Sequence, residues 1–206
     1  VPSTVNGADP RVYRIKALME NDAVVVTDHR RRRYERVTDW ADADPGMLLH
    51  HELRWELTDG DHLVGFIFMA TLDARDFLRD TVAYSRSQIR VEYPSLEGAS
   101  YYYVIPRGDR IFDEGIAIAF NDGARRPAAL HEYGHAVMTD LYGNVYSNLP
   151  FGEHEGPHSL HTVSDEEFAI NEGWAEFMEA VVDDSALNVP SSANADSPNV
   201  ETNHWW

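Results

Sequence analysis

One stretch decides the fold and the chemistry of this chain: Ala129-Leu130-His131-Glu132-Tyr133-Gly134-His135-Ala136-Val137-Met138. It contains His-Glu-x-x-His in an apolar setting, with a proline and a glycine placed to suit the two ends of a helix. Residues four apart lie on one face of a helix, so His131 and His135 can direct their imidazoles at one point. Neutral imidazole is a good zinc ligand. The sequence therefore predicts a helix from near residue 126 to residue 142 that carries two zinc ligands.

Glu132 follows the first histidine by one position, so it projects beside the histidine pair rather than over it. From there it cannot readily bind the same ion, but it can take a proton from a metal-activated water. This is the arrangement of a zinc hydrolase, with two ligands and one general base on one turn of helix. The alternative is a surface helix with two incidental histidines, which the apolar neighbours disfavour.

A third ligand must come from elsewhere in the chain. The pattern with a glycine three residues and a histidine six residues after the second ligand is excluded, because Met138 and Leu141 occupy those positions. A later helix is another source, since Glu172 and Glu176 are four apart and share a face. Glu172 can bind the metal, and Glu176 can accept a hydrogen bond from the far nitrogen of a ligand histidine, which fixes its tautomer.

Two alternatives for this region stay open. Residues 171–177 could instead form an amphipathic helix whose acidic face meets water. The rivals to Glu172 as third ligand are the three histidines of the intervening loop, His154, His158 and His161.

Together, His131-Glu-Tyr-Gly-His-Ala-Val-Met and Asn171-Glu-Gly-Trp-Ala-Glu-Phe resemble the two signatures of gluzincin-type zinc metallopeptidases, of which the thermolysin-like enzymes are familiar members. They are more similar still to secreted or surface bacterial and archaeal peptidases with HEYGH followed by EGWAE-type helices. The resemblance covers roughly residues 61–183. It implies zinc on His131, His135 and Glu172, Glu132 as the base, and Glu176 behind a ligand histidine.

The whole chain predicts an α+β, zincin-like fold: a mixed β-sheet, a packing helix, the His-Glu-x-x-His helix and a second helix with the third ligand. An apolar stripe of helical period predicts the packing helix from His62 to about Ala83. A capping box of Ser164 and Glu167 predicts the start of the second ligand helix. Alternating or β-rich segments predict strands at 13–19, 23–27, 49–57, 88–93, 99–105 and 115–120.

The resemblance implies that strand 99–105 forms the upper rim of a cleft, where an extended peptide adds to its free edge. We expect an N-terminal β-rich segment over residues 1–60, belonging to the same domain or to a small subdomain. A zincin-like catalytic domain is expected over 61–188. Residues 189–206 read as a loop or linker, with the chain continuing beyond it in the full protein.

Composition limits the partners and the location. The formal charge of −18 argues against nucleic acid and anionic membranes as main partners, because phosphate repels an acidic surface. The absence of cysteine excludes a thiolate zinc site. The most apolar stretch, Leu63–Leu72, is too short to span a bilayer. We expect a secreted or cell-surface protein that acts on a peptide or protein substrate, although no signal peptide is in the given chain.

The sequence thus predicts a zinc metalloendopeptidase that hydrolyses peptide bonds with a metal-activated water and Glu132 as general base. The alternative is a zinc-stabilised binding or adhesion module, derived from a peptidase, that does not cut. The retained Glu132 argues against it, since a structural site needs no base. Candidates for stabilising the oxyanion are a C-terminal residue beyond this chain or one of His154, His158, His161, Tyr142 and Tyr146.

Overall fold

The structure is a computed structural model that describes residues 11–38, 41–43, 61–152 and 164–183. These residues form a mixed α+β fold with three α-helices, which confirms the predicted α+β class. The helices are α1 (Asp61–Val82), α2 (Arg126–Leu141) and α3 (Glu166–Val182), with short 3-10 helices η1 (Phe120–Asp122) and η2 (Tyr146–Asn148). The strands are β1 (Arg11–Tyr13), β2 (Lys16–Leu18), β3 (Val24–Thr27), β4 (Glu35–Val37), β5 (Ala41–Ala43), β6 (Ile89–Glu92), β7 (Tyr101–Arg107) and β8 (Arg110–Ala117).

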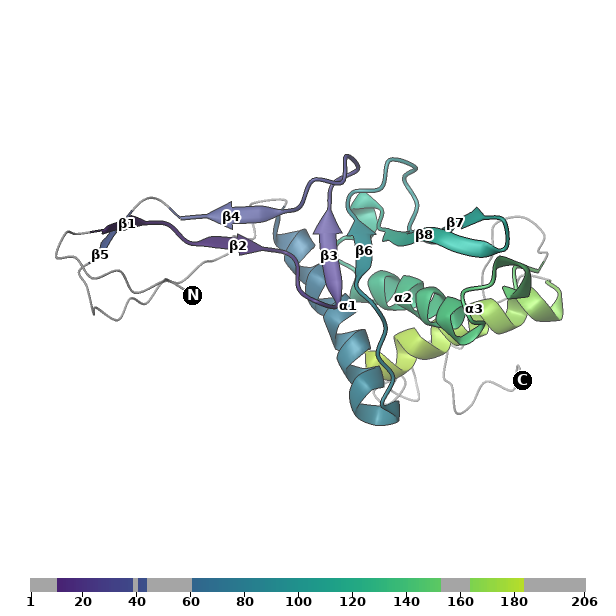
Figure 1. Ribbon diagram of the computed structural model, residues 1–206. Coiled ribbons are helices and arrows are strands. Elements are labelled where there is room, and N and C mark those ends of the chain that lie inside the picture. Colours follow the sequence, from purple (N-terminus) through teal and green to yellow (C-terminus); the bar gives the residue numbers. More distant parts are fainter. Residues whose placement is uncertain (1–10, 39–40, 44–60, 153–163, 184–206) are drawn as a thin grey trace.

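The main sheet has four strands in the order β3-β6-β8-β7. β3, β6 and β8 run parallel, whereas β7 and β8 form an antiparallel hairpin in which Tyr102 lies opposite Ile116. Among the described residues β7 pairs only with β8, so its other side is an edge of the sheet. The pairs β1–β5 and β2–β4 form a narrow ribbon that extends away from this sheet (Figure 1).

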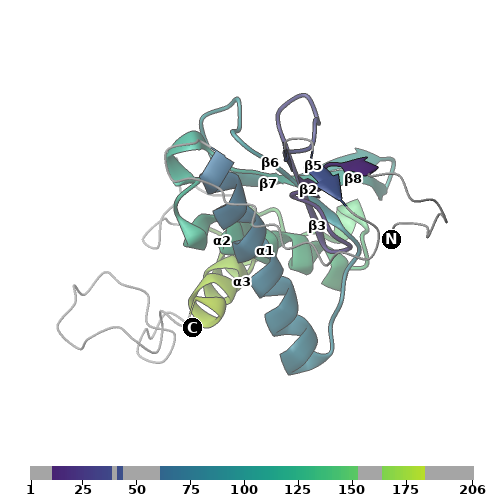
Figure 2. The ribbon, with the colours of Figure 1, turned by 90° about the vertical axis from the view of Figure 1, so that its left-hand side faces the viewer.

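All three helices lie on the same side of the main sheet (Figures 1 and 2). α1 packs on β3, and α2 packs on β7 and β8. The core between them is aliphatic on both sides. The sheet contributes Val24, Val26, Val91 and Ile116, with Ile118 directly after β8, and the helices contribute Val64, Ile67, Leu130 and Val137. This packing fixes α2 under the free edge of the sheet. None of the helices in the described part of the chain combines the length and the hydrophobicity of a membrane span.

α2 and α3 approach each other closely at one glycine. A Cβ atom at Gly134 would lie 2.9 Å from the Ala175 Cα and 3.2 Å from the Met178 Cβ. The Trp174 Nε1–H donates a hydrogen bond to the Gly134 carbonyl oxygen at 3.0 Å, which joins the two helices at the same point. Because Gly134 is flanked by the His-Glu-x-x-His side chains, the helix spacing here also sets the spacing between the candidate ligands.

We therefore expect Gly134→Ala to destabilise the protein by about 1–3 kcal/mol, because the added methyl group forces the helices apart. Gly65→Ala is a matched control within α1, where the new Cβ meets only the end of Met19 at 3.9 Å. That control should be neutral or stabilising by about 0.5–1 kcal/mol, the usual difference between alanine and glycine inside a helix. Thermal unfolding of both variants measures the difference, and equal midpoints would contradict the close approach.

Several sequence predictions agree with the structure and others need correction. α1 and α2 lie within about a residue of their predicted bounds. The two strands predicted at 13–19 and 23–27 belong to different sheets: β2 pairs with β4, and β3 pairs with β6. Val24 and Val26 are fully buried although β3 is an outer strand of the sheet, because they lie on the face of β3 that packs against α1.

Two element ends also differ from prediction. β8 begins at Arg110 rather than at residue 115, because Gly108 and Asp109 make a tight turn and the pairing with β7 starts directly after it. α3 is capped by Asp165, not by Ser164, since the Asp165 carboxylate accepts the hydrogen bond from the Phe168 amide. The strand predicted at 49–57 lies outside the described residues.

Candidate metal centre

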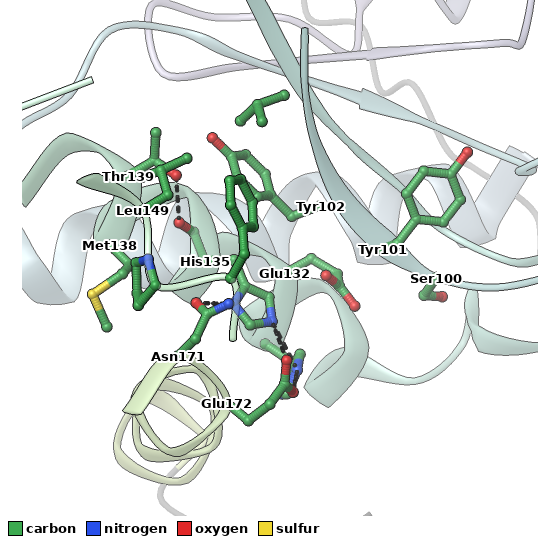
Figure 3. A pocket seen from close by; sticks show the side chains of 14 residues that line it. Ser100, Tyr101, Tyr102, Glu132, His135, Met138, Thr139, Leu149, Asn171 and Glu172 are labelled. Atoms are coloured by element: carbon green, nitrogen blue, oxygen red, sulfur yellow. Dashed lines mark hydrogen bonds and ion pairs between the residues drawn. The ribbon is translucent and has the colours of Figure 1, made fainter. Parts of the chain in front are cut away.

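Two helices bring three metal-binding side chains together. His131 and His135 lie on one face of α2, and Glu172 faces them from α3. The two Nε2 atoms are 3.2 Å apart, and the Glu172 carboxylate oxygens lie 3.3 Å from the His131 Nε2 and 3.5 Å from the His135 Nε2. Figure 3 shows His135 and Glu172 turned toward each other, with Glu132 beside them.

These distances fit a zinc ion. Nitrogen and oxygen ligands lie about 2.0–2.1 Å from zinc, so the corners of a tetrahedral site are roughly 3.3–3.4 Å apart. The Nε2–Nε2 separation of 3.2 Å matches that spacing, and so do the distances of 3.3 Å from the His131 Nε2 to the Glu172 Oε2 and of 3.5 Å from the His135 Nε2 to the Glu172 Oε1. Two imidazole nitrogens and one carboxylate oxygen also leave a fourth position open, as catalytic zinc sites require.

Asn171 fixes the orientation of His135, and the sequence analysis did not select it. The Asn171 Oδ1 lies 3.0 Å from the His135 Nδ1. A carbonyl oxygen only accepts hydrogen bonds, so Nδ1 carries the proton and Nε2 keeps its lone pair for a metal. The sequence contains a clue, since Asn171 directly precedes Glu172 on the same helix.

We expect Asn171→Leu to weaken zinc binding by roughly 10–100-fold, because His135 loses the partner that holds its ring and tautomer. Asn171→Asp is the control, since it keeps an acceptor oxygen in the same place and should retain most of the affinity. Competition with a chromogenic chelator measures both. Similar affinities for the leucine and aspartate variants would remove this role from Asn171.

Behind His131 lie two carboxylates rather than one. Glu176 and Glu179 each have an oxygen 3.9 Å from the His131 Nδ1, the distance of an ion pair rather than a hydrogen bond. Glu176 thus lies on the side of His131 that the sequence predicts. Glu179 was not predicted, although its position three residues after Glu176 places it on the same helix face.

Glu132 is a buried carboxylate between the candidate ligands and the edge of the sheet, with 8% of the residue exposed. Its carboxylate accepts a hydrogen bond from the main-chain amide of Tyr102 in β7. Burial raises the pKa of Glu132 to about 7, with His131 opposing this shift and Glu172 adding to it. A pKa near neutrality suits a group that must take up a proton and return it.

The surroundings of His131 shift its pKa by a different balance of effects. Burial lowers its pKa, but the carboxylates of Glu172, Glu132 and Glu176 outweigh burial and raise the pKa to about 9. Metal binding at His131 therefore competes with its protonation.

A pocket of about 230 Å³ opens over these side chains. Its residues come from the edge of β7, from α2 and α3, and from the segment after η2. The lining residues are Ser100, Tyr101, Tyr102, Val104, His131, Glu132, His135, Met138, Thr139, Leu149, Pro150, Phe151, Asn171 and Glu172 (Figure 3). Away from the histidines and glutamates, the lining has no charged side chain and includes the apolar side chains of Met138, Leu149 and Phe151.

The structure describes two of the candidates for oxyanion stabilisation, and neither lines this pocket. Tyr142 and Tyr146 do not line it, and the Tyr146 ring instead packs against Phe151 with the ring centroids 5.1 Å apart. His154, His158 and His161 lie outside the described residues. Tyr101 and Tyr102 do line the pocket, and the sequence placed both on the expected rim strand without giving either a role.

The structure combines an α+β fold with a His–His–Glu cluster, and comparison with known families supports a protein related to zinc metallopeptidases. Residues 79–206 match the family described as the Mycolysin C-terminal domain, and the chain belongs to this family. The match includes α2 and α3 and therefore all three candidate ligands. Searches of curated proteins and of solved structures give no significant match. The family is compatible with a module derived from a peptidase.

Proposed function

We propose that the protein is a zinc metallopeptidase of zincin-like architecture, with the metal held by His131, His135 and Glu172. The observation that carries this proposal is the convergence of the two Nε2 atoms and the Glu172 carboxylate, which lie at ligand-to-ligand distances suited to one zinc ion. When bound there, zinc supplies a Lewis acid that lowers the pKa of water and polarises a carbonyl group. The mycolysin family membership supports a peptide bond as the target.

The roles of the surrounding residues follow from their positions. Glu132 takes the proton from the attacking water and passes it to the leaving amine, which its buried position in the pocket beside the ligands favours. Asn171 holds His135, and Glu176 with Glu179 keeps negative charge behind His131.

The edge of β7 is the place where we expect the substrate backbone. An extended peptide can add to an unpaired strand edge through main-chain hydrogen bonds, while pockets beside the edge accept its side chains. The apolar end of the pocket, formed by Met138, Leu149 and Phe151, suits an uncharged side chain.

A second candidate function is a zinc-stabilised binding module that does not cut, and the family description of a C-terminal domain favours it. The buried Glu132 beside the ligands favours the peptidase instead. Burying a carboxylate costs free energy, and a purely structural metal site has no use for an extra base.

Zinc content and peptide cleavage together test the proposal. The protein is dialysed against metal-free buffer, analysed by elemental mass spectrometry, and then incubated with a library of fluorogenic peptides. About one zinc per chain with cleavage supports the peptidase. Zinc retention without cleavage favours the binding module, and failure to bind zinc contradicts both.

The remaining parts of this proposal concern the setting of the enzyme. We propose a peptide or protein substrate, no nucleic-acid partner and no membrane insertion, which the charge of −18 supports. Secretion or display on the cell surface is supported by the relation to mycolysin.

A further inference from the structure

A buried arginine joins the rim of the pocket to the helix below it. The Arg86 side chain is 1% exposed and follows α1 in the connection to β6. Its Nη2 lies 2.5 Å from the Glu114 Oε1 on β8, and its Nε lies 3.7 Å from the Asp140 Oδ2 near the end of α2. One cation thus holds a carboxylate from the sheet and a carboxylate from the helix.

Two tyrosines complete this group, which we call the Arg86 cluster: Tyr84, Arg86, Tyr102, Glu114 and Asp140. The Tyr84 hydroxyl donates to Asp140, and the Tyr102 hydroxyl donates to Glu114. Burial and the adjoining carboxylates raise the pKa of both phenols, so each keeps its proton and acts as a donor. Every member therefore has a partner of matching charge or hydrogen-bonding type within the cluster.

The cluster closes a ring with the candidate site. Tyr102 binds the cluster with its side chain and binds the Glu132 carboxylate with its main-chain amide. Glu132 and Asp140 both belong to α2. The path from Glu132 through Tyr102, Glu114 and Arg86 thus returns to the same helix at Asp140.

We propose that Arg86 is a positioning residue that sets the gap between the β7 edge and α2, and so holds the Tyr102 amide against Glu132. Without the guanidinium, Glu114 and Asp140 keep their negative charges in a half-buried place with no cation between them. Leaving buried charges unpaired is strongly unfavourable. The strand and the helix then separate or admit water, and Tyr102 loses its fixed position.

The opposite face of the same hairpin offers a matched control. Arg90 donates to the Tyr103 hydroxyl at 2.8 Å and to Asp113 at 3.0 Å. Tyr103 and Asp113 adjoin Tyr102 and Glu114 in sequence, and successive side chains of a strand point to opposite faces. Arg90 therefore has the same kinds of partner on the same two strands, but faces away from α2 and the pocket.

The decisive measurement is residue-resolved amide hydrogen exchange on the zinc-loaded full chain. Arg86→Met should speed exchange of the Tyr102 amide by about tenfold or more, because the free energy of local opening at this strand edge becomes smaller. Arg90→Met should leave that amide unchanged. An unchanged Tyr102 amide in Arg86→Met, or equal acceleration in both variants, would overturn the proposal.

Kinetics give a second measurement, which rests on the proposed peptidase function. With an extended fluorogenic peptide, Arg86→Met should raise KM by roughly tenfold with a smaller change in kcat, because the peptide pairs with a displaced strand edge. A merely structural role would reduce the folded fraction, lowering apparent kcat at constant KM, and this result would overturn the positioning role. Arg86→Lys keeps the positive charge, so its KM should lie between that of Arg86→Met and that of the wild type.

The peptidase proposal and the proposed role of Arg86 can be disproved independently of each other. If the wild-type protein cleaves no peptide, the peptidase function fails, while amide exchange at Tyr102 still decides the role of Arg86. If Arg86→Met does not fold, Tyr102→Phe removes only the phenol hydroxyl and carries the same exchange measurement. Faster exchange at residue 102 in that variant supports the cluster as the anchor, and unchanged exchange overturns it.

Discussion

Glu132→Gln should abolish peptide hydrolysis and keep the metal. The amide has the size of the carboxylate but cannot take a proton from water, so kcat should fall by about 10²–10⁴-fold, the usual contribution of a positioned base. Zinc content should stay near one per chain, because Glu132 lies beside the three donor atoms and is not one of them. Elemental analysis and initial rates on the same preparation measure both quantities.

The control for this variant is Glu167→Gln, the same chemical change at an exposed position in the first turn of α3. Its kcat should equal that of the wild type. Loss of zinc from Glu132→Gln would show that Glu132 is a ligand instead of the base. Undiminished hydrolysis would show that another group takes the proton.

Glu172→Ala should produce the largest loss of metal affinity. Two imidazoles alone leave zinc without its carboxylate ligand, and the loss should exceed about 100-fold, more than removal of a hydrogen-bonding partner of a ligand costs. Hydrolysis should fall with the metal content and recover only at high zinc concentration. Titration against a competing chelator measures the affinity, and rates at increasing zinc measure the recovery.

Glu176→Ala is the comparison, since Glu176 lies on the same face of α3 but contacts the far side of His131 at 3.9 Å. Its effect on affinity should be roughly tenfold or less. If Glu172→Ala keeps its zinc, one of His154, His158 and His161 supplies the third ligand. Single alanine substitutions at those three positions then identify it.

The parts of the fold that depend on local sequence could be predicted. The apolar stripe of α1 predicted one helix, and the apolar run of α2 between a proline and a glycine predicted another. The predicted bounds of both helices differ from those in the structure by about one residue. The helix start at Asp165 was placed one residue early, because Ser164 and Asp165 are both good caps and the sequence does not show which side chain reaches the Phe168 amide.

Strand pairing could not be predicted in the same way. The sequence of residues 24–27 does not indicate that residues 89–92 are their partners. Parallel strands are joined by a long crossover, so the partner lies far away in the sequence. The valines of β3 indicate a strand with a buried face but not which strand lies beside it, nor that β3 is an outer strand of the sheet.

The candidate site likewise has residues that local sequence predicts and residues that it does not predict. Residues at fixed offsets on one helix, such as His131, Glu132 and His135, follow from helix geometry alone. Glu172 required a resemblance to known signatures. Arg86 and Glu114 could not be found, because they meet only when α2 and the β7–β8 hairpin pack together. An isolated arginine in a loop looks the same whether it is buried or free.

The position of β3 bears on where this protein can be divided. The stretch shared with the mycolysin family starts at residue 79, near the end of α1, whereas β3 lies before α1 and pairs with β6 inside the main sheet. A chain trimmed to the shared stretch would lose that outer strand and most of the helix covering it. The row of amides and carbonyls on β6 would then be exposed, and such an edge invites association between chains. The stretch that matches the family therefore does not contain all of the elements that build the main sheet of this structure.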